Sequence, residues 1–530
     1  MDPSRTAARR LRTDVAVVGF GPVGKLLAIQ LGSRGHQVVV VDRNEVDYRL
    51  PRAVTHCSDF ARILQSVGLA PDTIGHITEP YDDMYVWRNG AGETLVEVDW
   101  SGRGESGWYN TYFFSQPALE RALQERVDAL GSVRVLRGWE AVGLEQEHGR
   151  AQLTARCEGT GEAVVVDAAW VVGADGAHSR VREWAGIGWH DEGYFHDWLV
   201  VDVEPRPELR FPHVASQSCD VRRPSTMVPG GPGRRRWECM RLPHETKEEL
   251  NRAGKAWELL APHGITPANS VLERHSTYTF QAGWATEWRR GRVLLAGDAA
   301  HLMPPFAGQG LGAGVRDVMN LSWKLDAVLR GLAGDDLVDT YGTERLHHVS
   351  AFVRFSVELG QVICITDADE ARRRDERMIG EWAAGKKPPA PPRPGLGSGL
   401  HAGTWGGTLA RQGRVELGGE PAALFDDALG GPGALIARTT SALAELPEHL
   451  RAPLRELGIS LVALAGPPEP GVVPVRDVDG TYRAWLDEMG VDVVLVRPDF
   501  HLYGAGDAHC APELAGSLLR RLRDVFAGAA

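Results

Sequence analysis

A glycine-rich turn near the N-terminus is the feature that most constrains the fold of this chain. The β-branched run at 14–18 enters Gly19-Phe20-Gly21-Pro22-Val23-Gly24, and an amphipathic segment and a second apolar run ending at Asp42 follow. This order of strand, turn, helix, strand and acid is typical of a dinucleotide-binding unit, in which the glycines make the tight turn, admit the pyrophosphate and let the helix pack on the strand. A plain tight turn would explain the glycines alone. The whole pattern therefore predicts dinucleotide binding, without distinguishing FAD from NAD.

Two further motifs follow apolar runs in the same way. Gly173-Ala174-Asp175-Gly176-Ala177-His178-Ser179 comes after VVVDAAWVV, and Gly297-Asp298-Ala299-Ala300-His301 comes after RVLLA. Each motif alone is explained as well by a helix N-cap, because Ser and Asp often cap helices that follow strands. Three nucleotide-type turns in this order are harder to explain by capping, and they favour FAD.

Hydrophobic periodicity predicts the elements between these motifs. Helices are expected at about 59–67 and 117–130, the second with Pro117 in its first turn. Short alternating strands are expected between 82 and 112. Residues 185–285 indicate mostly strands and loops, with a hairpin at 227–243 where Gly and Pro cluster.

The length of 530 residues predicts two or three hydrophobic cores. The segment KKPPAPPRPGLGSG at 386–399 is the clearest linker, because its prolines are stiff and its glycines are flexible. About 130 residues follow it, which is an ordinary size for a separate domain.

Charge and composition exclude several classes of partner. The net charge of −12 and the lack of a basic stripe argue against nucleic acid. No uncharged apolar run is long enough to predict a membrane span. The 6 cysteines include no CxxC pair, so neither a disulfide framework nor a metal site is predicted. A reducing, cytoplasmic location is the natural interpretation.

Taken together, the motifs resemble those of the class A FAD-dependent aromatic monooxygenases, which have the para-hydroxybenzoate hydroxylase fold. The residues that carry the resemblance are GFGPVG, PRAV at 51–54, Gln116 with Leu119-Glu120, GADGAHSRVR, and GDAAHLMPPFAGQGLGAGVRDVMNLSWKL at 297–325. Within that family the chain is similar to the 3-(3-hydroxyphenyl)propionate hydroxylases and to the polyketide and rifampicin hydroxylases. The resemblance covers residues 1–370 firmly and the C-terminal part loosely.

The resemblance implies an α/β fold with a Rossmann-like FAD-binding domain, an inserted β-sheet substrate domain and a C-terminal thioredoxin-like domain. We expect the FAD-binding domain at 1–80, 113–184 and 286–384, the substrate-binding domain at 81–112 and 185–285, a linker at 385–399, and the thioredoxin-like domain at 400–530. Because the last domain has no CxxC pair, a structural or dimer-contact role is expected there rather than redox chemistry. A homodimer is therefore left open.

The resemblance also implies roles at the nucleotide end of the cofactor. The glycines of the first turn (Gly19, Gly21 and Gly24) would hold the FAD pyrophosphate, and Asp42, followed by Arg43, would bind the adenosine ribose. Arg52 and Gln116 would contact FAD, with Arg52 near the ribityl–pyrophosphate region.

At the flavin end, Asp175 belongs to a motif that serves both FAD and nicotinamide, and Gly297 with Asp298 would lie at the ribityl chain. The loop from Pro304 to Gly312 would run along the isoalloxazine ring. Its glycines leave backbone N–H groups accessible at the start of a helix. The residues expected to face the ring are Pro304, Gly308, Gly310, Leu311 and Gly312.

By the same resemblance, the protein is expected to hydroxylate a phenolic or heteroaromatic small molecule. NADPH or NADH would reduce FAD transiently, and O2 would then form a C4a-hydroperoxyflavin that transfers oxygen to the ring. The setting would be natural-product biosynthesis or aromatic catabolism. Another peroxyflavin oxygenation (epoxidation or Baeyer–Villiger), a flavin oxidase or dehydrogenase, and a non-catalytic FAD-binding protein stay open as alternatives. A flavin halogenase is disfavoured because no WxWxIP motif is recognisable.

His56 and Tyr109 are the candidate catalytic residues, because both lie in segments that could reach the substrate and assist a phenol. The competing interpretation is a packing role for each. The segment Thr55-His56-Cys57-Ser58 and the glycine at 312 depart from the pattern of many relatives, so the resemblance does not identify the substrate.

Overall fold

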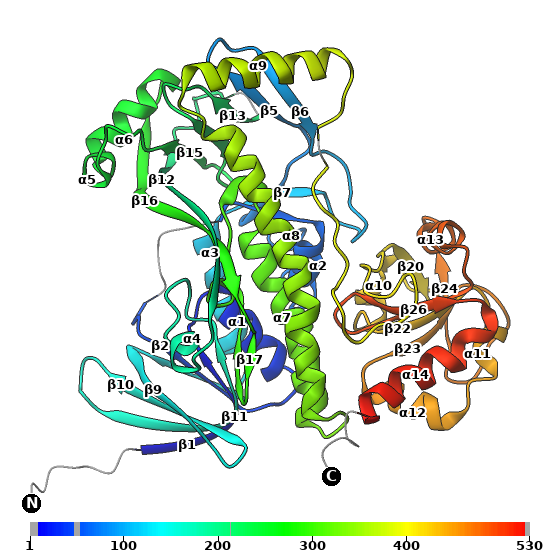
Figure 1. Cartoon of the computed structure of the whole chain (residues 1–530). Coiled ribbons are helices and arrows are strands. Elements are labelled where there is room, and N and C mark those ends of the chain that lie inside the picture. Colours follow the sequence, from blue (N-terminus) through cyan, green and yellow to red (C-terminus); the bar gives the residue numbers. More distant parts are fainter. Residues whose placement is uncertain (1–8, 47–52, 212–213, 389, 525–530) are drawn as a thin grey trace, which may run out of the picture.

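A mainly parallel sheet forms the base of the molecule (Figure 1). The computed structural model describes residues 9–46, 53–211, 214–388 and 390–524. The order in this sheet is β17-β18-β11-β1-β2-β8, and β9 and β10 continue antiparallel from β11. Its strands are β1 (Arg9–Val18), β2 (Val38–Asp42), β8 (Val133–Arg137), β9 (Trp139–Glu147), β10 (Arg150–Cys157), β11 (Ala163–Gly173), β17 (Arg289–Arg290) and β18 (Val293–Leu295). Strand β2 is buried along its valines, as expected for a parallel strand covered on both faces.

The carboxyl ends of the parallel strands bring the three sequence motifs together. Strands β1, β11 and β18 run parallel, so they end at one edge of the sheet. There the N–H of Ala174 donates to the carbonyl of Val18 at 2.8 Å, and the N–H of Ala296 donates to that of Gly173 at 2.9 Å. This edge is where α/β sheets bind nucleotides. The predicted Rossmann-like arrangement is therefore confirmed.

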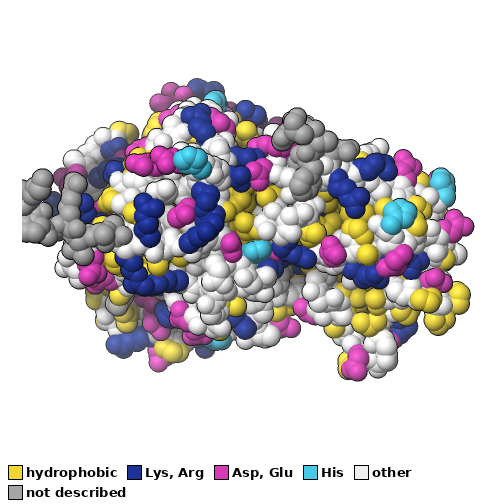
Figure 2. All heavy atoms as spheres, turned by 90° about the horizontal axis from the view of Figure 1, so that it is seen from below, with side chains coloured by type: hydrophobic (Ala, Val, Ile, Leu, Met, Phe, Trp, Pro, Cys, Tyr) yellow, Lys and Arg dark blue, Asp and Glu magenta, His cyan; other side chains and the backbone are white. Residues whose placement is uncertain are grey.

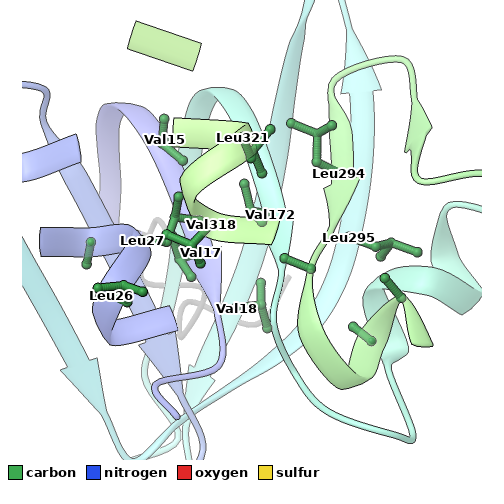
Figure 3. Packing of buried hydrophobic residues seen from close by; sticks show 14 of the residues in the cluster. Val15, Val17, Val18, Leu26, Leu27, Val172, Leu294, Leu295, Val318 and Leu321 are labelled. Atoms are coloured by element: carbon green, nitrogen blue, oxygen red, sulfur yellow. The ribbon is translucent and has the colours of Figure 1, made fainter. Parts of the chain in front are cut away.

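Three helices cover this sheet: α1 (Pro22–Gly32), α3 (Gln116–Asp128) and α7 (Gly310–Leu329), and a short helix, α4 (Arg180–Trp184), follows β11. Figure 3 shows side chains of α1 and α7 gathered against those of β1 and β18. The labelled residues are Val15, Val17, Val18, Leu26, Leu27, Val172, Leu294, Leu295, Val318 and Leu321, all of which are buried. This packing fixes α7, and with it the loop that leads into its N-terminus.

A second large sheet stands above the first (Figure 1), in the order β19-β16-β12-β15-β14-β13-β5-β6. Its strands are β5 (Met84–Asn89), β6 (Thr94–Asp99), β12 (Trp189–Pro205), β13 (Ala215–Cys219), β14 (Ser225–Pro229), β15 (Arg235–Met240), β16 (Ser270–Ala285) and β19 (His301–Leu302). The predicted hairpin is confirmed, since β14 and β15 pair antiparallel around Gly230–Arg234. Strands from 81–112 and 185–285 thus share one sheet, while the domain boundaries themselves stay a prediction.

Helices cover one face of the second sheet, in a region where the sequence indicated mostly strands and loops. The helices α5 (Lys247–Leu250) and α6 (Ala253–Leu260) pack on buried side chains of β12 and β15 such as Leu199 and Trp237. The expectation for 185–285 was therefore incomplete. The opposite face looks towards α8 (Asp339–Ile363) and α9 (Ala368–Ala383). A small sheet of β3 (Thr55–Cys57), β7 (Thr111–Phe114) and β4 (Thr78–Pro80), with α2 (Ser58–Gln65), lies between the two large sheets.

The C-terminal part is a separate α/β layer beside α7 and α8 (Figure 1). Its sheet has the order β21-β20-β24-β23-β22-β25-β26. The strands are β20 (Arg414–Leu417), β21 (Ala423–Leu424), β22 (Ala434–Ala437), β23 (Ser460–Ala463), β24 (Val473–Asp477), β25 (Val493–Val496) and β26 (Leu502–Gly506). The helices are α10 (Phe425–Leu429), α11 (Ser441–Ala444), α12 (Glu448–Glu456), α13 (Thr481–Met489) and α14 (Ala511–Asp524). Its thioredoxin-like character stays a prediction.

Buried ion pairs dock the C-terminal layer on the rest of the chain. Arg62 of α2 donates to both carboxylate oxygens of Asp426, at 2.6 and 2.8 Å, and to the carbonyl of Ala410. Glu344 of α8 accepts from both Nη atoms of Arg497 at 2.8 Å. Because breaking a buried pair leaves an uncompensated charge, these contacts hold the layer in one position.

Three observations on the described residues concern membrane spans, cysteines and surface charge. No single helix among them is long and apolar enough to cross a membrane, although the bent pair Asp335–Ile363 with Ala368–Ala383 reaches that length and composition. All six cysteines are free thiols. Figure 2 shows basic and acidic side chains interspersed on the face seen from below.

Candidate flavin and substrate site

One cavity of about 2130 Å³ runs from the edge of the first sheet to the face of the second. Gly21 and Asp42 line one end, the loop around Gly308 lines the middle, and aromatic side chains of the second sheet such as Trp87 line the other end. The cavity therefore joins the predicted nucleotide site to the predicted substrate domain.

The three glycines of the first turn have three different surroundings. Gly19 has φ +103°, and a Cβ there would lie 2.2 Å from the carbonyl oxygen of Ala174. A Cβ on Gly24 would lie 2.1 Å from the carbonyl oxygen of Gly19, so this glycine allows the helix to pack on the strand. A Cβ on Gly21 would meet nothing within 4 Å and would occupy cavity space. Gly21 is also the N-cap of α1 and provides no side-chain cap, so the helix presents its N-terminus to the cavity, as an anionic pyrophosphate requires.

Asp42 stabilises the first glycine turn by accepting two backbone hydrogen bonds. Its Oδ2 accepts a hydrogen bond from the N–H of Phe20 at 2.7 Å, and its Oδ1 accepts one from the N–H of Asn44 at 2.7 Å. Asp42 and Arg43 both line the cavity. The predicted contact of Arg52 lies outside the described residues.

Gln116 fastens the chain at the start of β3 to helix α3. Its Oε1 accepts from the N–H of Ala53 at 2.8 Å, and its Nε2 donates to Glu120 at 2.9 Å. Glu120 also accepts from the buried ammonium of Lys25 at 3.2 Å. Gln116 also lines the cavity, so this buried chain of polar groups reaches the cavity wall.

The turn after β11 both caps a helix and lines the cavity, so the two interpretations of its motif, a helix N-cap and a nucleotide-binding turn, are compatible. Asp175 Oδ1 accepts from the hydroxyl of Ser179 at 2.6 Å, and Asp175 Oδ2 accepts from the N–H of Val181 at 3.1 Å. Ser179 Oγ in turn accepts from the N–H of Arg182, so Ser179 caps α4 as the alternative proposed. Asp175 also lines the cavity, and burial raises its pKa.

Asp317 of α7 organises the third motif, although the sequence did not single it out. Its Oδ2 accepts from the N–H of Gly297 at 3.0 Å and lies 2.7 Å from His301 Nε2. Its Oδ1 accepts from Arg345 Nε at 2.9 Å, and the side chains of Asp317 and Arg345 are completely buried. Burial acts to raise the pKa of Asp317, but the charges and hydrogen bonds of His301 and Arg345 hold it below its usual value. The turn that carries Asp298 is thus anchored from beneath, and Asp298 lines the cavity.

The loop between β19 and α7 presents backbone N–H groups to the middle of the cavity. Gly308 has φ +63°, and α7 begins at Gly310 without a side-chain cap on Gln309. The N–H groups of the first helical turn, which include those of Leu311 and Gly312, therefore have no side-chain acceptor in the described chain. Pro304 precedes the short turn Pro305–Ala307. Such donors suit the carbonyl edge of a flavin ring.

A buried polar cluster supports this loop from behind. Arg316 donates to Gln309 Oε1 at 3.0 Å from both Nη atoms and contacts Cys57 Sγ at 3.0 Å. Its Nε pairs with Asp59 of α2. Burial acts to raise the pKa of Asp59, but Arg316 holds it far below its usual value. No local sequence pattern predicts this pair, because its members are 257 residues apart.

Aromatic rings form the walls at the substrate end. Tyr85, Trp87 and Phe113 are buried and line the cavity, together with Phe280 and Phe306. Tyr85 stacks on Trp100 with ring centroids 4.4 Å apart. Rings of this kind bind a flat apolar molecule and exclude water.

The two predicted catalytic residues differ in position. His56 borders the cavity but is only 3% exposed, its Nε2 lies 3.0 Å from Thr78 Oγ1, and its ring stacks on Tyr112. The described residues that line the cavity do not include Tyr109, whose ring lies against the guanidinium of Arg103. These contacts favour packing roles, and the catalytic role of each stays a prediction.

Burial lowers the pKa of His56 from 6.5 to about 4, so the histidine is neutral in the folded protein. Between these two pH values the unfolded chain binds a proton that the folded chain does not, so stability present above pH 6.5 is lost as the pH falls towards 4. The loss amounts to about 3 kcal/mol. We expect His56→Phe, which keeps a ring against Tyr112, to unfold in urea with less acid dependence than the wild type. Equal acid dependence would contradict this account, and a kcat that falls about a hundredfold in a folded variant would support a catalytic role instead.

Comparison with known proteins identifies the family. A family model described as "FAD binding domain" matches residues 12–356, and one described as "HcaD C-terminal domain" matches residues 407–521. A probable NADH-specific resorcinol 4-hydroxylase of Rhodococcus jostii is 36% identical over 96% of this chain and 94% of that protein. The 3-(3-hydroxy-phenyl)propionate/3-hydroxycinnamic acid hydroxylase of Escherichia coli is 31% identical over 97% of this chain and 94% of that protein. The chain belongs to the FAD-dependent aromatic hydroxylases.

The fold of this hydroxylase agrees with solved structures over almost its whole length. The flavin-dependent monooxygenase PieE, solved with FAD and substrate, superposes with a TM-score of 0.79 at 23% identity and covers 97% of this chain and 100% of its own. Aklavinone-11 hydroxylase, solved with FAD and aklavinone, has a TM-score of 0.77 at 23% identity, with coverage of 96% and 99%. The family models and the relatives above confirm the predicted family, flavin cofactor and monooxygenase class, and these structures confirm the α/β fold.

Proposed function

We propose that this hydroxylase acts on a single-ring phenol, with NADH rather than NADPH as its reductant. The observation that carries the proposal is the one continuous cavity that joins an uncapped nucleotide turn at Gly21 to an aromatic-walled end. Identity of 36% over nearly the whole chain to the probable NADH-specific resorcinol 4-hydroxylase supports the substrate class and the reductant. Bound FAD supplies the redox and oxygen chemistry, and the protein binds, orients and excludes water.

The residues that hold FAD belong to this proposal. The turn glycines and the N-terminus of α1 hold the pyrophosphate, Asp42 and Arg43 lie at the ribose, and the start of α7 donates N–H groups to the ring. The proposed FAD contacts are Gly19, Gly21, Gly24, Asp42, Arg43, Arg52, Gln116, Asp175, Gly297, Asp298, Pro304, Gly308, Gly310, Leu311 and Gly312. The cavity walls support the set, since Gly21, Asp42, Gln116, Asp175 and Asp298 all line it.

The test is oxidation of NADH and of NADPH by the FAD-loaded protein, with resorcinol, 3-(3-hydroxyphenyl)propionate or no aromatic present. We expect a phenol to stimulate oxidation of NADH, by a larger kcat/KM than that of NADPH, and to be recovered heavier by one oxygen atom. Stimulation without oxygen insertion, or an equal response to both nucleotides, would contradict the substrate or the reductant respectively. A cytoplasmic location and a homodimer, both expected from the sequence, are proposed with this function.

A further inference from the structure

A polar patch interrupts the aromatic wall of the cavity. It consists of Asp202 on β12 and of Arg236 and Glu238 on the adjacent strand β15, and we call it the acid–arginine patch. In the antiparallel register Arg236 stands opposite Asp202, and Glu238 lies one pleat further along the same face of the sheet. Arg236 and Glu238 line the cavity.

The charges in this patch are already balanced. Arg236 donates from Nε and Nη2 to the two carboxylate oxygens of Asp202, at 2.7 and 3.0 Å, and its side chain is 1% exposed. Arg274 of β16 adds a second guanidinium 3.3 Å from Asp202, and Glu238 adds the second carboxylate. The buried guanidinium nitrogens of Arg274 make no hydrogen bond within the described chain, and Arg274 is not among the described residues that line the cavity. Because a buried pair resists the loss of either partner, Arg236 is committed to Asp202. Among the described members of this charge cluster, Arg236 is therefore the cation that lines the cavity, and its hydrogen bonds to Asp202 leave it poorly placed to pair with an incoming carboxylate.

Glu238 is the member of the patch that remains open to a ligand. Its side chain is 11% exposed, and Arg236 Nη1 lies 3.6 Å from Oε1, beyond hydrogen-bond distance. Arg236 therefore forms only a long ion pair with this carboxylate, and no hydrogen bond to it shorter than 3.5 Å occurs among the described residues. Burial raises the pKa of Glu238, and the charge of Arg236 opposes that rise. A buried carboxylate of this kind is stabilised by a hydroxyl donor supplied from the cavity.

The neighbouring polar groups hold this part of the wall still. Thr226, opposite Glu238 on β14, donates to Gln217 Oε1 at 2.6 Å, and Tyr85 donates to the same oxygen at 3.3 Å. Gln217 Nε2 donates to the carbonyl of Ser225 at 2.9 Å. Because these hydrogen bonds fix the neighbouring side chains, they restrict the Glu238 carboxylate to one position.

We propose that Glu238 accepts a hydrogen bond from the second hydroxyl group of a dihydroxybenzene substrate, and that the acid–arginine patch selects a neutral dihydroxybenzene over a phenol that carries a carboxylate side chain. The inference rests on the proposed function and deepens it. A substrate carboxylate beside Glu238 would bring two negative charges together in a dry cavity, which is strongly unfavourable. A neutral ring with two hydroxyl groups provides the donor and still packs between the aromatic walls.

The experiment titrates FAD-loaded protein with three probes and follows the perturbation of flavin absorbance. The probes are resorcinol, 3-(3-hydroxyphenyl)propionate and 3-methylphenol, which lacks the second hydroxyl. We expect Glu238→Leu to weaken resorcinol binding about tenfold to a hundredfold, since it removes the acceptor of a charge-assisted hydrogen bond. We expect Glu238→Gln to tighten binding of the propionate by about tenfold, since it removes the opposing charge. Binding of 3-methylphenol is expected to change little in either variant.

Glu273→Gln is the matched control, because this residue of β16 pairs with Arg234, is about one-third exposed and is not among the residues that line the cavity. It is expected to bind all three probes as the wild type does. Equal loss of all three probes in the Glu238 variants would indicate a structural role and overturn the inference. A wild type that prefers the propionate to resorcinol would also overturn it while leaving the proposed hydroxylation of a phenol intact. If the wild type binds and hydroxylates no phenol, the proposed function falls with it.

Discussion

A Gly21→Val variant is expected to fold normally and to lose most of its affinity for FAD. Gly21 has φ −75° and ψ −174°, a conformation that any residue adopts, and a Cβ there would meet no protein atom within 4 Å. The added side chain would instead occupy the cavity at the N-terminus of α1, where the pyrophosphate is expected. We expect the FAD dissociation constant to rise by about a hundredfold or more, which corresponds to about 3 kcal/mol.

The measurement is FAD affinity by flavin fluorescence, together with urea unfolding of the FAD-free protein. Gly75→Val is the matched control, since a Cβ there also meets nothing within 4 Å but Gly75 is not among the residues that line the cavity. Gly19→Ala provides the contrast, because its Cβ would lie 2.2 Å from a backbone oxygen and should destabilise the FAD-free protein as well. Unchanged FAD affinity in a folded Gly21→Val protein would show that the cofactor does not approach this turn.

Replacing Asp317 by alanine is expected to lower the free energy of unfolding by more than breaking any exposed ion pair of the same helix would. The substitution removes the partner of the completely buried Arg345 and the acceptor for the Gly297 N–H. Breaking a buried pair in this way costs about 3–5 kcal/mol. Because the Gly297 turn also carries Asp298 at the cavity, FAD affinity should fall with stability.

Urea unfolding measures this effect, and Asp326→Ala is its control on the same helix. Asp326 pairs with His36 at 2.8 Å and with the more exposed Arg330 at 3.4 Å, and its own side chain is 15% exposed, so removing it should cost less than removing the completely buried Asp317. If Asp317→Ala does not fold, Asp317→Asn keeps the shape of the side chain and isolates the charge. Destabilisation of Asp317→Ala no larger than that of Asp326→Ala would contradict the role given to this network.

The parts of the fold with strong local signals followed from the sequence. The βαβ turn, the helices α2 and α3 and the hairpin β14–β15 are specified by glycines, periodicity and turn residues within short windows. The helices α5 and α6 were missed, although Thr246 and Glu249 form a capping box, which is itself a local signal of a helix start.

The contacts that shape the site could not be predicted from local signals in the sequence. Asp317 with Arg345, Asp59 with Arg316, and Asp202 with Arg236 are ion pairs between distant segments. Such pairs impose no periodicity, so only the fold reveals them. The surroundings of His56 could not be predicted either, because its sequence context does not reveal that both ring nitrogens have protein partners.

The measurement that tests the central claim most directly is the fate of labelled oxygen gas. FAD-loaded protein is incubated with NADH, resorcinol and isotopically labelled O2, and the product is analysed by mass spectrometry. Hydroxylation through the bound flavin predicts one labelled oxygen atom in each molecule of product. A hydroxylated product without label would show that the inserted oxygen does not come from O2. NADH consumption that yields only peroxide would show that this chain oxidises NADH without hydroxylating the phenol.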